Sequence, residues 1–122
     1  MSHSAAQAYG SVAKQIASPR QLEAQLLLKA AARLQAIQDD WDRSRTDLRQ
    51  ALLYNRKLWT VLVSSVTDPK HQMPAIIRQN VANLGLFVFK QTVDLAMQPR
   101  PEPLKSLVLI NRELAAGLLG RA

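Results

Sequence analysis

The chain of 122 residues is long enough to bury one hydrophobic core but too short for two. It has a net charge of +7, no cysteine, and only 4 glycines and 6 prolines, so long helices are favoured over many short strands. The missing cysteines exclude disulfides, thiolate metal sites and a cysteine nucleophile. We therefore expect one all-α domain over residues 1–122.

The excess of basic residues makes nucleic acid, an acidic partner or a membrane surface candidate partners. The basic residues are dispersed along the chain, however, and a solvated bundle surface explains most of them. No secretory signal is recognisable at the N-terminus, and no apolar window is long enough to cross a bilayer. We expect a cytoplasmic protein without membrane insertion.

Residues 1–17 are predicted to form a helical arm, in which Tyr9 docks the arm onto a helical body over residues 18–120. Ser18 and Pro19 predict the start of the first body helix, as N-cap and first helical residue. Gln21 completes a capping box, and Glu23 is favoured by the helix dipole. The predicted apolar stripe consists of Leu22, Leu26, Ala30, Leu34, Ile37 and Trp41.

A central helix is predicted over residues 48–66, with Thr46 as its cap. Its apolar stripe recurs at helical spacing and consists of Leu48, Leu52, Asn55, Trp59, Leu62 and Val66. Other apolar residues widen this zone: Leu53, Tyr54, Leu58, Val61 and Val63. A helix that is apolar nearly all round is either central in its fold or partly a docking surface.

Asp68-Pro69 predicts the end of the central helix, and Pro74 predicts the start of the next one. The core side of that third helix is predicted to carry Ile77, Val81, Leu84, Val88 and Leu95, with Gly85 permitting close packing. A proline-rich connector over residues 98–103 leads to a last helix over residues 104–119. Its predicted core face holds Leu107, Asn111, Leu114 and Leu118, and Gly120 is the predicted C-cap.

Four helices with short links predict an up-and-down bundle, or else an open array completed by a partner chain. The two histidines, His3 and His71, are far apart in sequence, and no phosphate-binding loop or nucleophile motif occurs. We predict a protein that is not an enzyme, without catalytic residues, cofactor or metal site.

The tetrad N-R-x-L occurs twice, at residues 55–58 and 111–114. In each copy an asparagine, Asn55 or Asn111, lies on the apolar face with Arg56 or Arg112 beside it. A buried asparagine commonly fixes packing register through hydrogen bonds, at some cost in stability. We interpret both asparagines in this way.

Three arginines flank the apolar stripe of the central helix. Arg45, Arg49 and Arg56 fall within about 40° of one another at a helical repeat of about 100° per residue. Phosphates of RNA or an acidic helix could meet this basic edge, with Trp59 close by for stacking. The alternative is that the aliphatic stems of these arginines cover grooves of the bundle.

The chain resembles the FlaF family, small regulators of flagellar biosynthesis in alphaproteobacteria. The matching pieces, in order, are Ala8-Tyr9, Ser18-Pro19-Arg20-Gln21-Leu22-Glu23, Asn55-Arg56-Lys57-Leu58-Trp59, Asp68-Pro69, Met73-Pro74, Ile110-Asn111-Arg112 and Gly117-Leu118. The family motif thereby assigns a structural role to Tyr9, Ser18, Pro19, Arg20, Glu23, Asn55, Asn111 and Arg112.

The resemblance implies a positive factor for flagellin synthesis or secretion, opposed by the repressor FlbT, with flagellin as a chaperone-type client. We expect Leu58 and Trp59 to contribute to an apolar groove for the client, with Arg49 and Arg56 at its basic edge. Two alternatives remain: an RNA-binding regulator acting on flagellin messenger RNA, and a scaffold that binds FlbT without touching flagellin.

Overall fold

The computed structural model describes residues 19–121, so the expectations for Tyr9, Ser18 and the arm over residues 1–17 lie outside the described residues. The described part contains four long helices, α2 (Pro19–Asp39), α4 (Leu48–Val66), α5 (Ala75–Met97) and α6 (Leu104–Leu118), and no strand. The prediction of an all-α bundle of four helices is confirmed.

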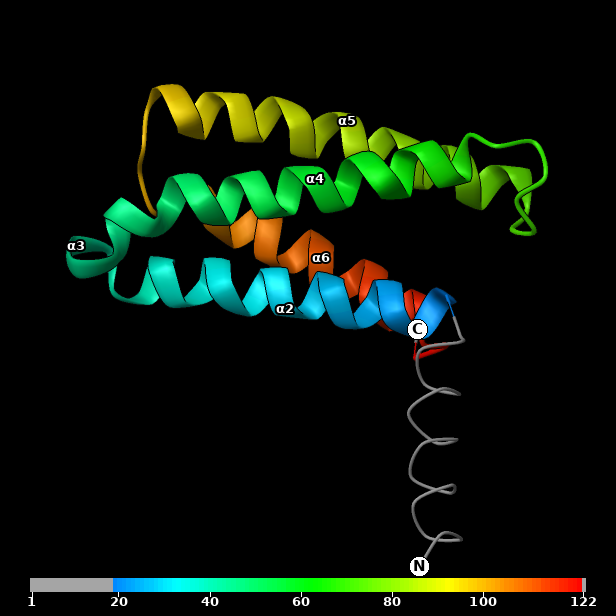
Figure 1. The fold of residues 1–122 in the computed structure, drawn as a ribbon, viewed down its shortest axis with the longest axis horizontal. Coiled ribbons are helices and arrows are strands. Elements are labelled where there is room, and N and C mark those ends of the chain that lie inside the picture. The colour runs from blue at the N-terminus through cyan, green and yellow to red at the C-terminus, as the bar shows by residue number, and fades with distance from the viewer. Residues whose placement is uncertain (1–18, 122) are drawn as a thin grey trace, which may run out of the picture.

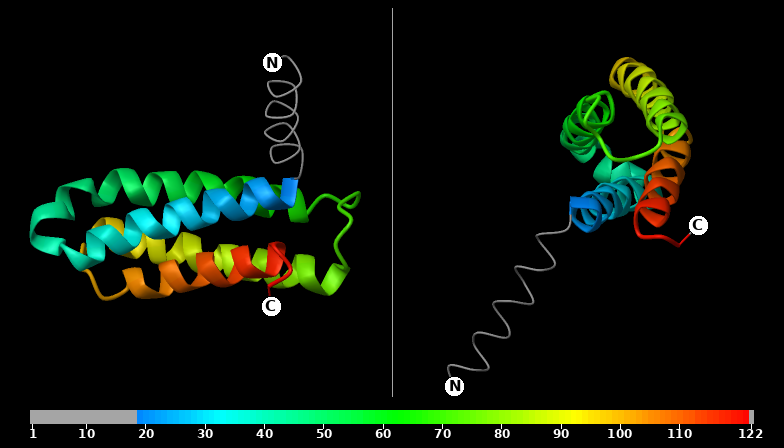
Figure 2. Two further views of the ribbon diagram at one scale, coloured as in Figure 1. Left: turned by 90° about the horizontal axis from the view of Figure 1, so that it is seen from below. Right: turned by 90° about the vertical axis from the view of Figure 1, so that its right-hand side faces the viewer.

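Successive long helices run in opposite directions along the bundle, as Figure 1 shows. The end-on view in Figure 2 shows the four helices arranged around a common interior. The closest packing is between α2 and α6, followed by α4 on α5 and α2 on α4, whereas α5 and α6 approach each other at few points. Consequently α5 has one close neighbour, and α2 has two.

The connection between α2 and α4 is itself helical. It consists of the short helix α3 (Trp41–Ser44) and the 3₁₀ turn η1 (Arg45–Asp47), which leads directly into α4. The amide of Leu48 donates to the carbonyl of Arg45, and no side chain caps the start of α4. The prediction of Thr46 as N-cap was therefore wrong, because the preceding turn already supplies a backbone acceptor.

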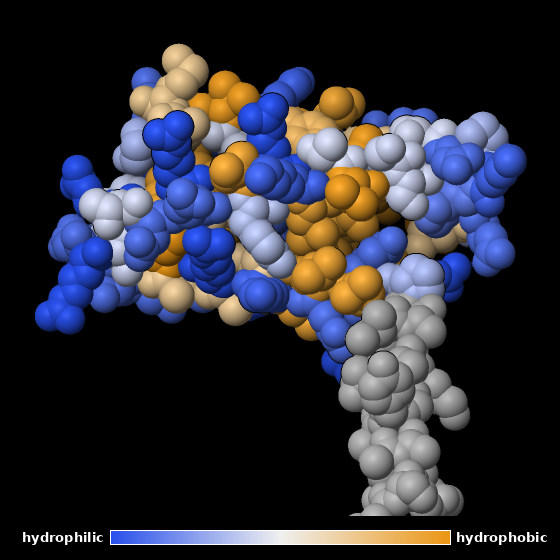
Figure 3. All heavy atoms as spheres, in the orientation of Figure 1, coloured by the Kyte–Doolittle hydropathy of each residue, from blue (hydrophilic) through white to orange (hydrophobic). Residues whose placement is uncertain are grey.

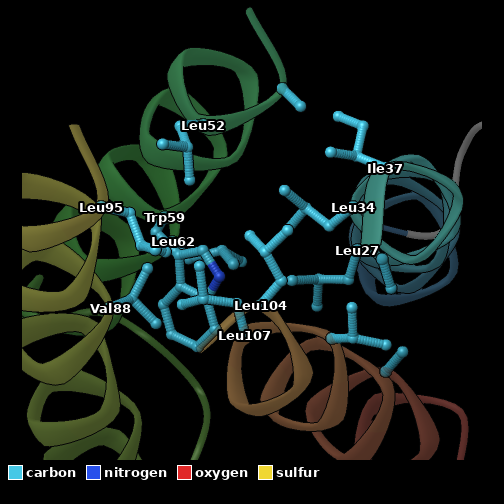
Figure 4. Close-up of a cluster of buried hydrophobic side chains, with 14 of the residues drawn as sticks. Leu27, Leu34, Ile37, Leu52, Trp59, Leu62, Val88, Leu95, Leu104 and Leu107 are labelled. Atoms are coloured by element: carbon cyan, nitrogen blue, oxygen red, sulfur yellow. The ribbon is translucent and has the colours of Figure 1, made fainter. Parts of the chain in front are cut away.

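The helix α4 has the predicted bounds, and its buried face includes the whole predicted stripe. The buried residues are Leu48, Ala51, Leu52, Asn55, Trp59, Leu62 and Val66. Figure 4 shows labelled side chains of all four long helices converging around Trp59 in the middle of the core. Burial of such large side chains contributes about 1.5–3 kcal/mol each.

The face of α2 that turns inward differs from the predicted one. Its buried residues are Ala24, Leu27, Ala30, Ala31, Leu34 and Ile37. Leu22 is 39% exposed and Leu26 is only half-buried, so the predicted stripe was wrong at its N-terminal end. The reason is that small buried residues, Ala24 and Ala31 on α2 and Ala115 on α6, let these two helices approach closely.

The core side of α5 is narrower than predicted. Val81, Val88 and Leu95 are buried as expected, but Ile77 is 44% exposed and Leu84 is 37% exposed. Because α5 packs closely only on α4, its flank towards α6 is left partly uncovered. On α6, Leu107 and Asn111 are buried while Leu114 and Leu118 are half-buried.

Two glycines have the structural roles that the sequence predicted. Gly85 lies where α5 crosses α4, and a Cβ on it would collide with Val63 and lie 3.6 Å from the Trp59 ring. Gly120 has a φ of 73° and follows the end of α6, as expected for a C-cap glycine.

Candidate functional site

The two asparagines of the repeated tetrad meet in the interior of the bundle. The amide nitrogen of Asn111 donates to Asn55 Oδ1 at 2.7 Å and to the carbonyl oxygen of Leu27 at 3.3 Å. Asn111 Oδ1 in turn accepts from Trp59 Nε1 at 2.9 Å. All four residues are fully buried. One side chain on α6 thereby bonds α2 and α4 together, which fixes the relative position of three helices.

One polar atom of this network is left over. Asn55 Nδ2 is buried and has no hydrogen-bond partner among the described residues. An unpaired buried amide costs about 1–3 kcal/mol, so the network stabilises the fold less than three hydrogen bonds alone would suggest. It specifies register rather than maximal stability.

Trp59 is a core residue and not part of an exposed groove. Its side chain is fully buried, and Figure 4 shows the indole between Val88 of α5 and Leu107 of α6. The expectation that Trp59 contacts a client on the surface is corrected accordingly, because the ring is already enclosed and its N–H already bonded to Asn111.

The other three residues expected to bind a partner do not lie together. Arg49 and Arg56 are exposed on the flank of α4 that faces α5, the same flank as Val63. Leu58 is half-buried and lies about 180° around the helix from Arg49, at about 100° per residue. The structure therefore separates the apolar and basic halves of the expected site.

Leu58 belongs to an apolar patch on the face shared by α2 and α4. Figure 3 shows apolar atoms gathered there, towards the end of the bundle at which α2 begins. Helical spacing places Leu22 and Leu26 on the side of α2 that carries Lys29, and Val61 on the side of α4 that carries Leu58; Leu22 and Val61 are exposed and Leu26 is half-buried. On the same face the charged groups of Lys29 and Arg33 each lie about 6 Å from the centre of the Tyr54 ring, in cation–π geometry.

Residues of the N-terminal motif line a cavity at the start of α2. Pro19, Arg20 and Glu23 face Lys70 and His71 of the α4–α5 loop around about 380 Å³. Partial burial raises the pKa of the Glu23 carboxyl above its ordinary value, and the charges of His71 and Arg20 oppose this rise. Arg112, the other motif residue, is exposed on α6.

The helix α5 carries most of the exposed large hydrophobic residues described, and sequence reasoning missed it as a site. Of the twelve exposed large hydrophobic residues described, seven are on this helix: Ile76, Ile77, Leu84, Leu86, Phe87, Val93 and Met97. We call these seven residues the outer face of α5. The signal was available in the sequence, since Leu86, Phe87, Val93 and Met97 are apolar residues outside the predicted stripe.

The outer face of α5 has two flanks. Leu84 and Phe87 line an open groove of about 560 Å³ with Ile110 of α6. Leu86, Val93 and Met97 lie on the other flank, towards α4, together with the half-buried Phe89. The flank towards α4 extends from Leu86 to Met97, which is about three helical turns.

Two other features were sought among the described residues: metal sites and membrane-spanning helices. No group of three or more His, Asp or Glu side chains in residues 19–121 could hold a metal ion. No helix within that range is long and apolar enough to cross a membrane. The described helices do expose large apolar side chains, most of them on α5.

The chain belongs to the FlaF family. The family model described as flagellar protein FlaF matches residues 5–118, which is nearly the whole chain. No curated protein and no solved structure matches the sequence. The family gives the protein a role in flagellar biosynthesis.

Proposed function

We propose that this protein binds flagellin in the cytoplasm, as a chaperone-like positive factor for flagellin synthesis or secretion, without catalysing a reaction. The observation that carries the proposal is the outer face of α5, where seven large hydrophobic side chains are exposed on one helix. The family's role in flagellar biosynthesis supports flagellin as the client.

Physical chemistry supports binding of an amphipathic helix. Clustered exposed apolar side chains, such as those along each flank of α5, are costly in water and usually mark an interaction site. A helix that lays its apolar side chains along such a surface removes them from water, at about 25 cal/mol for each Å² buried. The family resemblance implies flagellin as the client, and its terminal segments are amphipathic helices that stay unfolded until assembly. Shielding such a segment is the chemistry this surface offers.

Co-purification of flagellin with variants of the outer face tests the proposal. Phe87→Asp and Val93→Asp place a charge on each flank of α5, at side chains 44% and 60% exposed, so both variants should fold. Leu28→Asp, at a side chain 38% exposed on α2, is the matched control. We expect flagellin binding to weaken roughly tenfold or more in at least one α5 variant and not in the control. Equal binding by all three folded variants would contradict the proposal.

RNA binding is the second candidate, and one observation favours it. The guanidinium groups of Arg45, Arg49 and Arg56 are exposed, and none has an ion-pair or hydrogen-bond partner in the described chain. Trp59, which stacking on a base would require, is buried instead. A gel-shift assay over a salt series distinguishes the two, because phosphate contacts weaken steeply with salt. Retained micromolar RNA binding at moderate salt would reverse the order of the two candidates.

A third possibility is a scaffold that binds FlbT and not flagellin. Separate co-purification of the protein with each of the two candidates decides it. Binding to FlbT alone would replace flagellin as the proposed partner.

A further inference from the structure

We infer that the seam between α4 and α5 binds an amphipathic helix that carries carboxylates along one flank. The seam surface is defined by Arg49, Leu53 and Arg56 of α4 and by Leu86, Val93 and Met97 of α5. The inference rests on the proposed function only for the identity of the client. The chemistry of the occupant follows from the surface itself.

The register of the two helices places these residues along one line. Gly85 of α5 packs against Val63 of α4, and the helices run antiparallel. Two turns back from Val63 along α4 is Arg56, and two turns on from Gly85 along α5 is the level of Val93. Two further turns reach Arg49 and Pro99, which line the same pocket. The pocket independently supports the register deduced from the glycine contact.

The apolar half of the seam surface is a helical stripe. Leu86, Phe89, Val93 and Met97 recur at spacings of three and four along α5. Leu86, Val93 and Met97 are 58%, 60% and 77% exposed, and Leu53 on the α4 side is 42% exposed. A stripe with this spacing is complementary to the i, i+3, i+4, i+7 anchors of a docked helix.

The charged half of the seam surface is entirely positive. The helix α4 contains no Asp or Glu, and the one acidic residue of α5, Asp94, is paired with Arg100 at 2.6 Å. Arg49 and Arg56 therefore have no carboxylate of their own chain to meet among the described residues. Figure 3 shows strongly hydrophilic atoms alternating with apolar ones over α4 and α5 along this edge. A bound helix with acidic residues on one flank would supply the missing partners.

The seam ends in a pocket of about 440 Å³ with the same character. Arg45 and Arg49 stand at its edge, and Leu48, Leu52 and Leu95 form its apolar wall. The lining contains no acidic residue. An apolar anchor side chain with a neighbouring carboxylate fits this end of the seam.

Charge and shape favour an acidic helix over other occupants. Two copies of this chain that meet seam to seam would bring arginines against arginines, because the seam surface has no free carboxylate. A nucleic acid would use the arginines but would leave the stripe of Leu86, Val93 and Met97 in water. A helix with one apolar and one acidic flank covers both halves at once.

Two synthetic helical peptides test the inference apart from flagellin. They share one apolar face and differ only on one flank, which carries Glu in one peptide and Lys in the other. Fluorescence anisotropy with the full chain should show the Glu peptide binding at least about tenfold tighter. Arg56→Glu should abolish that preference, whereas Lys57→Glu, the adjacent exposed position on another flank of α4, should retain it.

The outcomes separate this inference from the proposed function. Equal binding of the two peptides, or equal effects of Arg56→Glu and Lys57→Glu, would overturn the assignment of the seam. The assignment would also be overturned if Phe87→Asp abolished binding of the Glu peptide and Val93→Asp did not, since Phe87 lies in the groove towards α6. Preference for the Glu peptide without flagellin co-purification would support the seam and refute flagellin as client.

Discussion

The helix pair α2–α6 buries most of its large apolar side chains, whereas α5 leaves many of its own exposed. Between α2 and α6, small buried residues allow close approach, and only Leu22, Leu28 and Leu109 of these two helices are exposed large hydrophobics. Seven such residues are exposed on α5 alone. The apolar side chains between α2 and α6 are mostly buried. The seven exposed on α5 are of the same kind, but no neighbouring helix of the described chain covers them. The contrast shows that the same kinds of side chain are buried where two helices approach closely and exposed where a helix has one close neighbour.

The largest expected effect comes from the network that links α2, α4 and α6. Asn111→Ala removes three hydrogen bonds and leaves Trp59 Nε1 buried and unpaired, so we expect a loss of about 3–5 kcal/mol in the free energy of unfolding. Asn55→Ala removes one of those bonds and also the unpaired Nδ2, so we expect about 1–2 kcal/mol. Urea denaturation of the two variants measures both values. Equal losses would show that Asn111 does not hold the helices together as described.

The next effect concerns the packing of α5 on α4 at Gly85. Gly85→Ala forces α5 away from Val63 of α4, and overpacking of this kind costs about 1–3 kcal/mol. Gly117→Ala is the matched control, because no atom lies within 4 Å of the added Cβ and alanine favours the helix by about 0.5–1 kcal/mol. Thermal unfolding should move the two variants in opposite directions. A stabilising Gly85→Ala would contradict the close packing of α5 on α4.

Polar substitution on the outer face of α5 should leave the fold almost unchanged. We expect Val93→Ser and Met97→Ser to alter the free energy of unfolding by less than about 0.5 kcal/mol, since both side chains are mostly exposed. Both should reduce client binding. If a denaturant titration shows that either substitution strongly lowers the free energy of unfolding, the residue is part of the core and the contrast with α2–α6 fails.

The smallest effect is a pH dependence at the start of α2. Burial raises the pKa of Glu23 above its ordinary value of 4.5, so the folded state binds this proton more tightly than the unfolded chain does. Stability therefore falls as the pH rises from 4.5 through the folded pKa, and the penalty persists above it. Glu23→Gln should remove this decline, whereas Glu113→Gln, at an exposed position, should not. A stability profile of Glu23→Gln parallel to the wild type would refute the assignment.

Much of the architecture could be predicted because its signals are local. The bounds of α4 follow from the recurrence of apolar residues and from Pro69 beyond its end. The burial of Asn55 and Asn111 follows from their position on apolar faces. Periodicity gives the angle of a residue around its own helix, and this was sufficient for both asparagines.

The candidate surface could not be predicted in the same way, because the neighbours of each helix follow from tertiary packing. Trp59 was predicted both in the apolar stripe of α4 and in a groove for a client, and the structure places it in the core. On α2 the approach of α6 turns Leu27 inward and leaves Leu22 outside. On α5 apolar residues surround the helix, so periodicity alone does not identify the uncovered side.

Site-specific photocrosslinking can locate the contact with flagellin on α5 or on α2. A photoreactive phenylalanine analogue is placed at Val93 on the outer face of α5 or at Leu28 on α2, and the full chain is irradiated with purified flagellin. We expect a flagellin adduct from position 93 and none from position 28, because seven of the exposed large hydrophobic residues described lie on α5 and only two lie on α2. An adduct from position 28 alone, or equal adducts from both positions, would contradict it.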